Sequence, residues 1–336
     1  MPVNVGIIGA GRIGRVHADA LCRRISDAHV LAIADVNLEA AQAAAAEYGI
    51  PQATSDHTTI LSNGAIDAVI ICSSTDTHSQ FITDAAQAGK HIFCEKPVDF
   101  DLGRIDSALA AVNAAGVKLQ IGFNRRFDPN HARVRQAIVD GEIGTPHLLH
   151  IISRDPAPPP LAYIRVSGGI FLDMTIHDFD MARFLIGSEV EEIYAAAGVR
   201  VDPAIGEAGD VDTAIITLKF ANGVIGVIDN SRQAVYGYDQ RVEVFGSKGS
   251  ASTGNWYPNA VTISDSNSVR RDLPLNFFMD RYTDSYVAEM QAFIDAVVND
   301  KPSPVPGIEG RIPVVMGLAA RQSYIENRPV RLTEFQ

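Results

Sequence analysis

The stretch VNVGIIGAGRIG, residues 3–14, predicts how the first part of the chain folds. Residues 3–8 form a short, mostly apolar run of the kind that makes a buried strand. GAGRIG, residues 9–14, has the pattern GxGxxG and leads into a segment with helical composition. A strand, a glycine turn and a helix in this order are typical of a dinucleotide-binding domain, because the glycines let a pyrophosphate approach the positive N-terminus of the helix.

A second residue bears on the choice of dinucleotide. The apolar run 30–34 ends at Asp35, which lies 21 residues beyond Gly14. A carboxylate at this place accepts hydrogen bonds from the adenosine ribose hydroxyls and repels a 2′-phosphate. The sequence therefore predicts NAD rather than NADP, although Arg12 could partly offset the charge of Asp35.

Strands and helices alternate along the first third of the chain. The expected strands are 3–8, 30–34, 68–72, 91–94 and 118–122. The segments with helical spacing or composition are 13–25, 38–48, 78–88 and 101–115. Continuous apolar strands in this alternation indicate a parallel sheet covered by helices on both faces. We therefore expect residues 1–122 to form an α/β, Rossmann-type NAD-binding domain.

The pattern changes after Phe123. The expected helices are 130–140, 169–185, 282–298 and 307–327. The expected strands are 146–153, 190–199, 211–220, 224–231, 240–245, 261–263 and 330–332. Runs of strands separated by turn residues indicate an open, mostly antiparallel sheet. We expect residues 123–336 to form an α+β domain for substrate binding and oligomerisation.

Composition excludes several classes of protein. Among 336 residues, 28 Lys and Arg stand against 40 Asp and Glu, and a net charge of −12 does not favour binding to nucleic acid. The three cysteines, Cys22, Cys72 and Cys94, form neither a CxxC pair nor a Cys/His cluster, so no metal site or disulfide framework is indicated. Neither a signal peptide nor a membrane span is recognisable. We expect a cytoplasmic protein without a membrane partner.

The stretch CEKPV, residues 94–98, begins with the last residue of the predicted strand 91–94. The charged residues Glu95 and Lys96 and then Pro97 come directly after that strand. The carboxyl ends of strands in an open parallel sheet face the ligand crevice, so Lys96 could hydrogen-bond a reacting oxygen and stabilise its negative charge. The alternative is a lysine that only extends its ammonium group to water. The sequence does not show whether the Lys96–Pro97 bond is cis.

Oxidation of a secondary alcohol also releases a proton and so requires a base. Asp173 and His177 are four residues apart and would share one face of the predicted helix 169–185. One interpretation makes His177 the base and Asp173 the group that orients it or binds a substrate hydroxyl. The alternative is an ordinary helical pair, with the carboxylate stabilised by the helix dipole and the histidine satisfied on a partly buried face.

Together these motifs resemble the glucose-fructose oxidoreductase / inositol dehydrogenase / rhizopine-catabolism family of NAD(P)-dependent oxidoreductases. The resemblance covers nearly the whole chain, from GxGxxG through the EKP motif at residues 95–97 to the DxxxH helix and the C-terminal sheet. Five stretches look most like the inositol 2-dehydrogenase subgroup: GFNRRFDP (122–129), SRDP (153–156), DMTIHDFDMARFL (173–185), VYGYDQRVEVFGSKG (235–249) and FFMDRYTDSYVAEM (277–290). One departure is CSST at 72–75, where many members have Cys-Thr-Pro.

The resemblance implies roles for particular residues. The implied catalytic residues are Lys96, Asp173 and His177. The expected cofactor-binding residues are Gly9, Gly11, Arg12, Ile13, Gly14, Asp35, Ser73, Ser74, His78, Glu95 and Lys96. The expected substrate-binding residues are Lys96, Arg126, Asp155, Asp173, His177, Tyr236 and Tyr282. Two alternatives stay open: Arg126 could be a salt-bridged residue, and the two tyrosines could serve packing. Glu95 could orient Lys96 or touch the nicotinamide ribose.

The implied activity is NAD-dependent oxidation of a ring hydroxyl of a cyclic polyol, with myo-inositol first and 2-keto-myo-inositol (scyllo-inosose) as product. The same chemistry on scyllo-inositol, chiro-inositol or an aldose such as glucose is the alternative. A non-catalytic NAD-binding sensor would be expected to lack Lys96 or His177, and a sugar-to-sugar reductase that retains its cofactor would favour an N-terminal arm over that cofactor. The resemblance also implies a homo-oligomer, with a tetramer favoured over a dimer.

Overall fold

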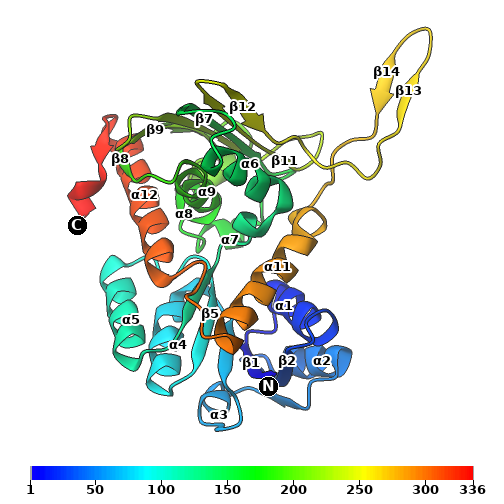
Figure 1. The fold of residues 1–336 in the computed structure, drawn as a ribbon, viewed down its shortest axis with the longest axis vertical. Coiled ribbons are helices and arrows are strands. Elements are labelled where there is room, and N and C mark those ends of the chain that lie inside the picture. Colours follow the sequence, from blue (N-terminus) through cyan, green and yellow to red (C-terminus); the bar gives the residue numbers. More distant parts are fainter. Residues whose placement is uncertain (1, 336) are drawn as a thin grey trace. The chain divides into compact units, whose positions relative to one another are not determined.

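A computed structural model describes residues 2–335 (Figure 1). The chain forms two compact units. Unit 1 comprises the residues up to Phe127 together with Asp284–Val314, and unit 2 comprises Asp128–Thr283 together with the residues from Val315 onward. The sequence placed the boundary at residue 122 and assigned everything after it to the second domain. The return of residues 284–314 to unit 1 has no signature in the local sequence pattern.

Unit 1 contains a six-stranded parallel sheet in the order β3-β2-β1-β4-β5-β6. The strands are β1 (Val3–Ile8), β2 (Ala28–Ala34), β3 (Gln52–Thr54), β4 (Ala68–Ile71), β5 (His91–Glu95) and β6 (Leu119–Gly122). This is the strand order of dinucleotide-binding folds, so the predicted α/β domain is confirmed. The short strand β3 was not predicted, because three partly exposed residues carry too weak a pattern.

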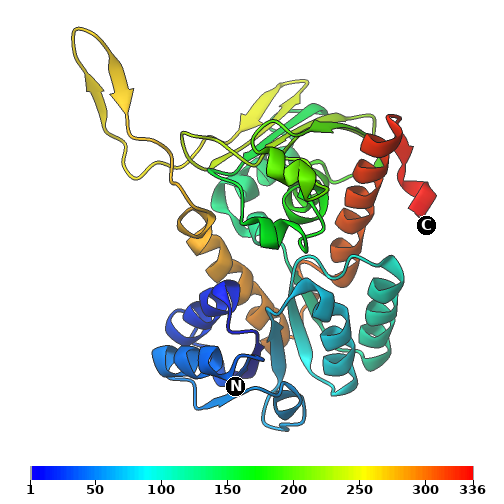
Figure 2. The same ribbon diagram turned by 180° about the vertical axis from the view of Figure 1, so that it is seen from behind.

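Helices lie on both sides of this sheet in the two opposite views (Figures 1 and 2). They are α1 (Arg12–Arg23), α2 (Leu38–Tyr48), α3 (Thr58–Leu61), α4 (Thr75–Gln87), α5 (Leu102–Ala115) and the later part of α11 (Phe278–Val298). All four residues of β4 are buried, as are the last four of β5. Burial on both faces explains why these strands are continuous apolar runs.

Unit 2 is built on a seven-stranded sheet in the order β12-β11-β7-β10-β9-β8-β15. The strands are β7 (Pro146–Arg154), β8 (Val190–Gly198), β9 (Thr213–Phe220), β10 (Ile225–Ser231), β11 (Asp239–Gly246), β12 (Gly249–Ser252) and β15 (Val330–Arg331). Only β7 and β10 are parallel, so the mostly antiparallel sheet is confirmed.

Alternate residues of this sheet are buried and exposed, which shows that one face is covered. The remaining elements of unit 2 are α6 (Pro129–Val139), α7 (Leu161–Ile164), α8 (Ile170–Asp173), α9 (Ile176–Ile186), α10 (Pro203–Glu207), the later part of α12 (Gly307–Glu326) and η2 (Leu332–Phe335). A short 3-10 helix, η1 (Asn124–Phe127), closes the first segment of unit 1.

The single helix predicted over 169–185 is wrong, because α8 ends at Asp173 and α9 begins at Ile176. Thr175 marks the break: its N–H donates to the carbonyl of Ile170, and its hydroxyl oxygen lies 3.2 Å from the same carbonyl oxygen. Its hydroxyl also lies 2.5 Å from Oδ1 of Asn230 on the sheet. Asp173 and His177 therefore belong to two successive helices, and their relation is set by Thr175 rather than by helical periodicity.

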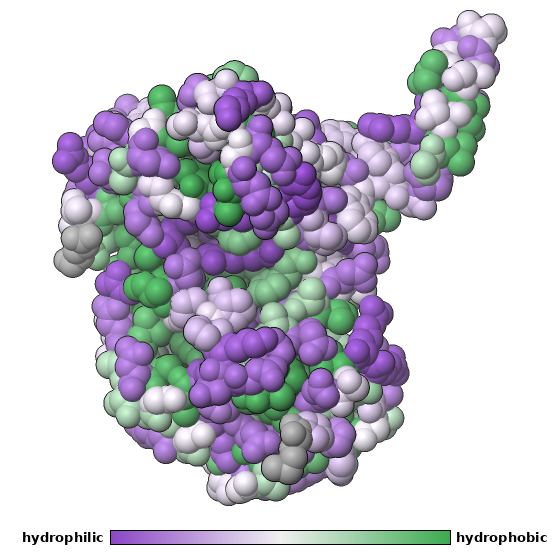
Figure 3. Space-filling model, in the orientation of Figure 1, coloured by the Kyte–Doolittle hydropathy of each residue, from purple (hydrophilic) through white to green (hydrophobic). Residues whose placement is uncertain are grey.

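A two-stranded hairpin, β13 (Thr262–Ser264) and β14 (Val269–Arg271), extends from the rest of unit 2 (Figures 1 and 2). Only its first strand was predicted. Every residue from 258 to 273 is exposed, and apolar side chains lie along the hairpin (Figure 3). They are Val261, Ile263, Val269 and Leu273. An isolated hairpin of this kind has little stability in water without a covering surface.

Candidate active site

The glycine turn between β1 and α1 leaves room for a ligand at the N-terminus of α1. Gly9 has a φ of +108°, and a Cβ atom there would come within 2.5 Å of the Cys72 carbonyl oxygen. A Cβ on Gly14 would lie 2.0 Å from the Gly9 carbonyl oxygen, so close packing requires glycine there too. A Cβ on Gly11, the N-cap of α1, would meet no described atom within 4 Å. The turn thus fits a pyrophosphate held by the first N–H groups of α1.

Asp35 lies beside this turn, as the sequence predicted. Its Oδ2 accepts a hydrogen bond from the Ala10 N–H at 2.7 Å, and its Oδ1 accepts one from the Asn37 N–H at 2.9 Å. Each carboxylate oxygen can accept a further hydrogen bond, so the ribose hydroxyls still have acceptors there. Gly9, Gly11, Gly14 and Asp35 together fit a dinucleotide without a 2′-phosphate.

The loop after β4 carries the predicted cofactor residues Ser73 and Ser74, and His78 lies near the start of α4. The hydroxyls of Ser73 and Thr77 share a hydrogen bond of 2.7 Å, which ties down a turn that lacks the usual proline. His78 is buried, and its Nδ1 and Nε2 lie 2.8 Å and 3.0 Å from the carbonyl oxygens of Pro97 and Ser73. Burial lowers the pKa of His78, and its hydrogen bonds to these two carbonyls only partly oppose that effect. The His78 side chain therefore connects the loop after β4 with the loop after β5.

Lys96 follows the last residue of β5 at the carboxyl end of the sheet, where the sequence predicted it. The Lys96–Pro97 bond is cis. The side chain of Glu95 turns inward and is only 10% exposed, with Oε1 lying 2.7 Å from Nε2 of the buried His17. The Glu95 carboxylate thus has a partner inside unit 1. The expected contact of Glu95 with the cofactor stays a prediction.

In unit 2, Asp173 is the centre of a polar cluster that includes the buried Arg232. Its Oδ1 accepts a hydrogen bond from the Tyr163 hydroxyl, and its Oδ2 accepts one from Nη1 of Arg232, both at 2.8 Å. Arg232 is 1% exposed, and Oδ2 atoms of Asp155 and Asp210 each lie 3.9 Å from its guanidinium. Three carboxylates thus surround one cation. His177 is the second residue of α9, four residues after Asp173, the last residue of α8.

The environment shifts the protonation of two members of this cluster. Burial and the charge of Asp173 raise the pKa of Tyr163, which keeps its hydroxyl a hydrogen-bond donor. Burial also raises the pKa of Asp210, against the opposing effects of the Ile170 and Val211 N–H groups and of Arg232. The cluster therefore carries a fixed donor and a fixed cation next to Asp173.

Tyr163, Asp210 and Arg232 were missed by the sequence analysis. Arg232 stands 59 residues after Asp173, so no local motif connects them. The available signal was the sheet itself: β7 and β10 are parallel and end side by side at Arg154 and Ser231, which brings Asp155 and Arg232 together. Asp155 and Arg232 could have been placed together from the sequence only if β7 and β10 had been predicted to be neighbouring strands.

Three further predicted residues have other partners. Arg126 forms an ion pair with Glu309 in unit 1, which agrees with the salt-bridge alternative. The Tyr236 hydroxyl donates to Asp239 at 2.6 Å and accepts from Arg154 at 3.1 Å. Tyr282 is 2% exposed and packs edge to face on Tyr238. These contacts account for the three side chains structurally, and substrate contact by each of them stays a prediction.

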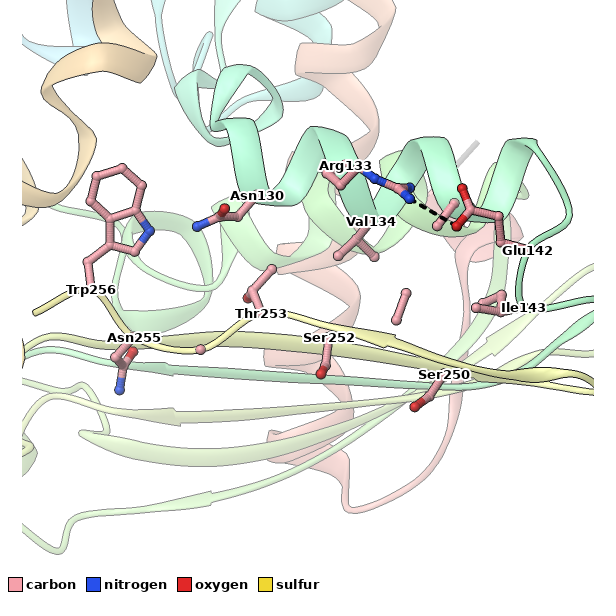
Figure 4. Close-up of a pocket in the computed structure, with 13 residues that line it drawn as sticks. Asn130, Arg133, Val134, Glu142, Ile143, Ser250, Ser252, Thr253, Asn255 and Trp256 are labelled. Carbon is pink, nitrogen blue, oxygen red and sulfur yellow. Dashed lines mark hydrogen bonds and ion pairs between the residues drawn. The ribbon is translucent and has the colours of Figure 1, made fainter. Parts of the chain in front are cut away.

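A cavity of about 600 Å³ lies between α6 and β12 with the loop that follows it (Figure 4). Arg133 and Glu142 form an ion pair on its wall, and Trp256 stands at one end (Figure 4). None of the residues predicted for the site lines this cavity. This cavity is therefore separate from the residues predicted for catalysis, whose roles stay predictions.

Comparison with known proteins bears on both units. Residues 3–123 match the model of the oxidoreductase family with an NAD-binding Rossmann fold, and residues 131–252 match that of the GFO/IDH/MocA C-terminal domain. The chain is 49% identical to myo-inositol 2-dehydrogenase of Thermotoga maritima over 332 residues, covering 99% of each protein. It is 36% identical to scyllo-inositol 2-dehydrogenase (NAD(+)) of Bacillus subtilis, covering 98% of this chain and 96% of the relative.

A solved structure is similar over the same length. Myo-inositol dehydrogenase from Lactobacillus casei, in complex with NAD(H) and myo-inositol, superposes with a TM-score of 0.88 at 27% identity. The match covers 98% of this chain and 97% of that protein. Among the described residues, no helix is both long and apolar enough to cross a membrane.

Proposed function

Because the chain belongs to the GFO/IDH/MocA oxidoreductase family, we propose that it oxidises a ring hydroxyl of a cyclic polyol to a ketone and reduces NAD+. Myo-inositol is the substrate we place first, with 2-keto-myo-inositol (scyllo-inosose) as the product. The observation that carries this proposal is the 49% identity, over 99% of both chains, to a myo-inositol 2-dehydrogenase. The glycine turn and Asp35 supply the fit to NAD described above.

NAD+, when bound, supplies the acceptor for the hydride that leaves the carbinol carbon. In this proposal the hydroxyl proton passes to His177, which acts as the general base. Lys96 donates a hydrogen bond to the reacting oxygen and stabilises its negative charge while the proton leaves. Asp173 accepts a hydrogen bond from the base or from a substrate hydroxyl. The contacts of Asp173 with Tyr163 and Arg232 support a fixed orientation of its carboxylate.

The remaining substrate contacts are proposals of the same kind. A polyol ring presents several hydroxyls, each of which donates and accepts, so a site with both carboxylates and cations can distinguish epimers. Asp155 is the best supported of these residues, because its carboxylate lies 3.9 Å from the guanidinium that also holds Asp173. We keep Arg126, Tyr236 and Tyr282 as less direct candidates.

Scyllo-inositol is the second candidate substrate, because the chain is also 36% identical to a scyllo-inositol 2-dehydrogenase. The two epimers differ at one carbon, so their discrimination depends on the placement of single polar groups. The test is a steady-state assay of NADH formation with myo-, scyllo- and chiro-inositol and with glucose. The largest kcat/KM with myo-inositol would support the first proposal, and a larger value with glucose than with every inositol would contradict it.

We also propose that the protein is a homo-oligomer that works in the cytoplasm. On the open face of the unit 2 sheet, Phe245, Leu148 and Ile225 are aligned side by side on three neighbouring strands and are 46–50% exposed. An apolar row of this kind, together with the exposed hairpin, supports packing against a second subunit. The free cysteines Cys22, Cys72 and Cys94 support a reducing compartment.

A further inference from the structure

Behind the EKP motif, unit 1 contains a buried cluster of three ionisable side chains. Glu95 comes from β5, His17 from α1 and Glu289 from α11, and their ligand-type atoms all lie within 4.8 Å of one another. His17 and Glu289 are 0% exposed and Glu95 is 7% exposed. Buried ionisable groups are costly unless they are hydrogen-bonded or paired, so such a cluster requires a physical reason.

The closest contact in the cluster is between His17 and Glu95. Nε2 of His17 lies 2.7 Å from Oε1 of Glu95. The His17 ring also packs edge to face on Phe93 and Tyr286, with ring centroids 5.0 Å and 5.8 Å apart. On the other side, a Cβ on Gly122 would lie 3.1 Å from both Cδ and Oε2 of Glu95, so the carboxylate is confined against β6.

A hydrogen bond explains this contact better than a shared metal ion. Zinc holds its nitrogen and oxygen ligands at about 2.0–2.2 Å in a tetrahedral arrangement, which puts neighbouring ligand atoms more than about 3 Å apart. The distance of 2.7 Å between His17 and Glu95 is that of a strong hydrogen bond. The cluster therefore holds the two side chains directly to each other.

This hydrogen bond joins two functional parts of unit 1. His17 lies on α1, three residues after the last glycine of the cofactor turn, and Glu95 immediately precedes Lys96. The Glu95 carboxylate is held to α1 by this contact with His17. We propose that His17 is a positioning residue: by holding Glu95 it fixes the Lys96 turn relative to the helix that binds the pyrophosphate.

The inference rests on the proposed function for Lys96, and the experiment uses His17→Phe and His17→Gln in the full-length enzyme. Phenylalanine keeps the ring packing but removes the hydrogen bond, whereas glutamine can still donate one to Glu95. Misplacing a reacting group by about 1 Å can cost up to about 100-fold in rate. We expect His17→Phe to lower kcat by about 10- to 100-fold while the KM for NAD changes less than about threefold. His17→Gln should keep most of the wild-type kcat.

A second kinetic comparison separates positioning from general destabilisation. If His17 acts through Lys96, then His17→Phe added to Lys96→Ala should lower kcat by less than about twofold further, because coupled residues are not additive. A structural defect would instead multiply the two losses. His29→Gln is the matched control, because His29 is an exposed histidine of β2 in the same unit, and it should leave kcat unchanged.

Hydrogen exchange measured by mass spectrometry supplies a readout that needs no substrate. His17→Phe should increase exchange in peptides covering residues 94–99 and leave exchange in β2 unchanged. If the wild-type protein oxidises no polyol, the proposed function fails, and this exchange pattern alone decides the inference. Unchanged exchange at 94–99, an unchanged kcat, or multiplicative losses with Lys96→Ala would each overturn it.

Discussion

Arg232 donates a hydrogen bond to Asp173 across 2.8 Å, from a position that is only 1% exposed. The two residues come from different elements, since Asp173 ends α8 and Arg232 follows β10. The same guanidinium lies 3.9 Å from the carboxylates of Asp155 and Asp210. This single buried cation therefore lies among three partly buried carboxylates and holds the one that belongs to the DxxxH motif by a direct hydrogen bond.

Removal of that cation should be costly. Arg232→Met leaves Asp173 without its buried counter-charge, and breaking a buried ion pair costs about 3–5 kcal/mol. We expect a loss of unfolding free energy of that size in urea at pH 7, together with a large loss of kcat/KM. Arg24→Met is the control, because Arg24 forms an exposed pair with Asp19 that is worth at most about 1 kcal/mol. Equal losses from the two substitutions would contradict the role assigned to Arg232.

Asp35 should determine the preference for NAD over NADP. Asp35→Ala removes the carboxylate that repels a 2′-phosphate and also the acceptor of the Ala10 N–H. We expect the ratio of kcat/KM for NAD to that for NADP to fall by about tenfold or more, which corresponds to about 1.4 kcal/mol. Asp27→Ala changes the charge equally at an exposed position in the same unit and should leave the ratio unchanged. A ratio that does not respond to Asp35→Ala would refute this assignment.

The sequence was sufficient to predict the parts of the site that follow from local order. A glycine turn after a strand, an acidic residue at the end of the next strand and a lysine at the end of β5 all lie where the pattern placed them. The contribution of Arg232 was not predictable in this way, because it depends on which strands are neighbours. The break between α8 and α9 was missed because Thr175 fits a helical pattern and its partner Asn230 is remote in sequence.

Glu95 illustrates the same limit. Its position in the EKP motif suggested that it orients Lys96 or touches the nicotinamide ribose, and the sequence named no partner for its carboxylate inside the unit. In the structure its carboxylate is bonded to His17, which no strand or helix pattern associates with it. Side-chain direction at a strand end depends on the neighbouring helix and on space such as that left by Gly122, and neither can be inferred from local residues.

Asp128 should give a defined pH dependence of stability in unit 2. It accepts a hydrogen bond from buried Arg281 and from the N–H groups of Asn130 and His131 at the start of α6. Burial tends to raise the pKa of Asp128, but the hydrogen bond from Arg281 and the charges of His131 and Arg281 outweigh it and lower the pKa. The folded state therefore binds this proton less readily than the unfolded state does, and the carboxylate stabilises the fold only while it is ionised.

We therefore expect Asp128→Asn to cost about 3–5 kcal/mol of unfolding free energy near pH 7. The difference from wild type should persist down to about pH 4, near the ordinary aspartate pKa, and then shrink as the pH falls through the lowered folded-state pKa. Urea denaturation between pH 3 and pH 7 measures this. Asp140→Asn, at an exposed position at the end of α6, serves as the control. A difference that grew on acidification would have the wrong sign for this account.

The open face of the unit 2 sheet should mediate association. Leu148 lies between Phe245 and Ile225 in the registered row, so Leu148→Lys places a charge in the middle of the apolar surface. At micromolar concentration, we expect the molar mass of this variant, measured by light scattering, to be lower than that of the wild type by the mass of at least one subunit. Val139→Lys introduces the same charge on α6, away from this row, and should not change the mass. A monomeric wild-type protein would refute the proposed oligomer.

Hydride transfer from one ring carbon to NAD+ is the central claim, and isotope transfer tests it most directly. Myo-inositol deuterated at carbon 2 would be incubated with the enzyme and NAD+, and the reduced cofactor and the ketone would be analysed by mass spectrometry. The account predicts one deuterium in each reduced cofactor molecule, equimolar with 2-keto-myo-inositol, and a rate at least about 100-fold lower in His177→Ala. Reduced cofactor without deuterium, or no reduction of NAD+ by this substrate, would contradict it.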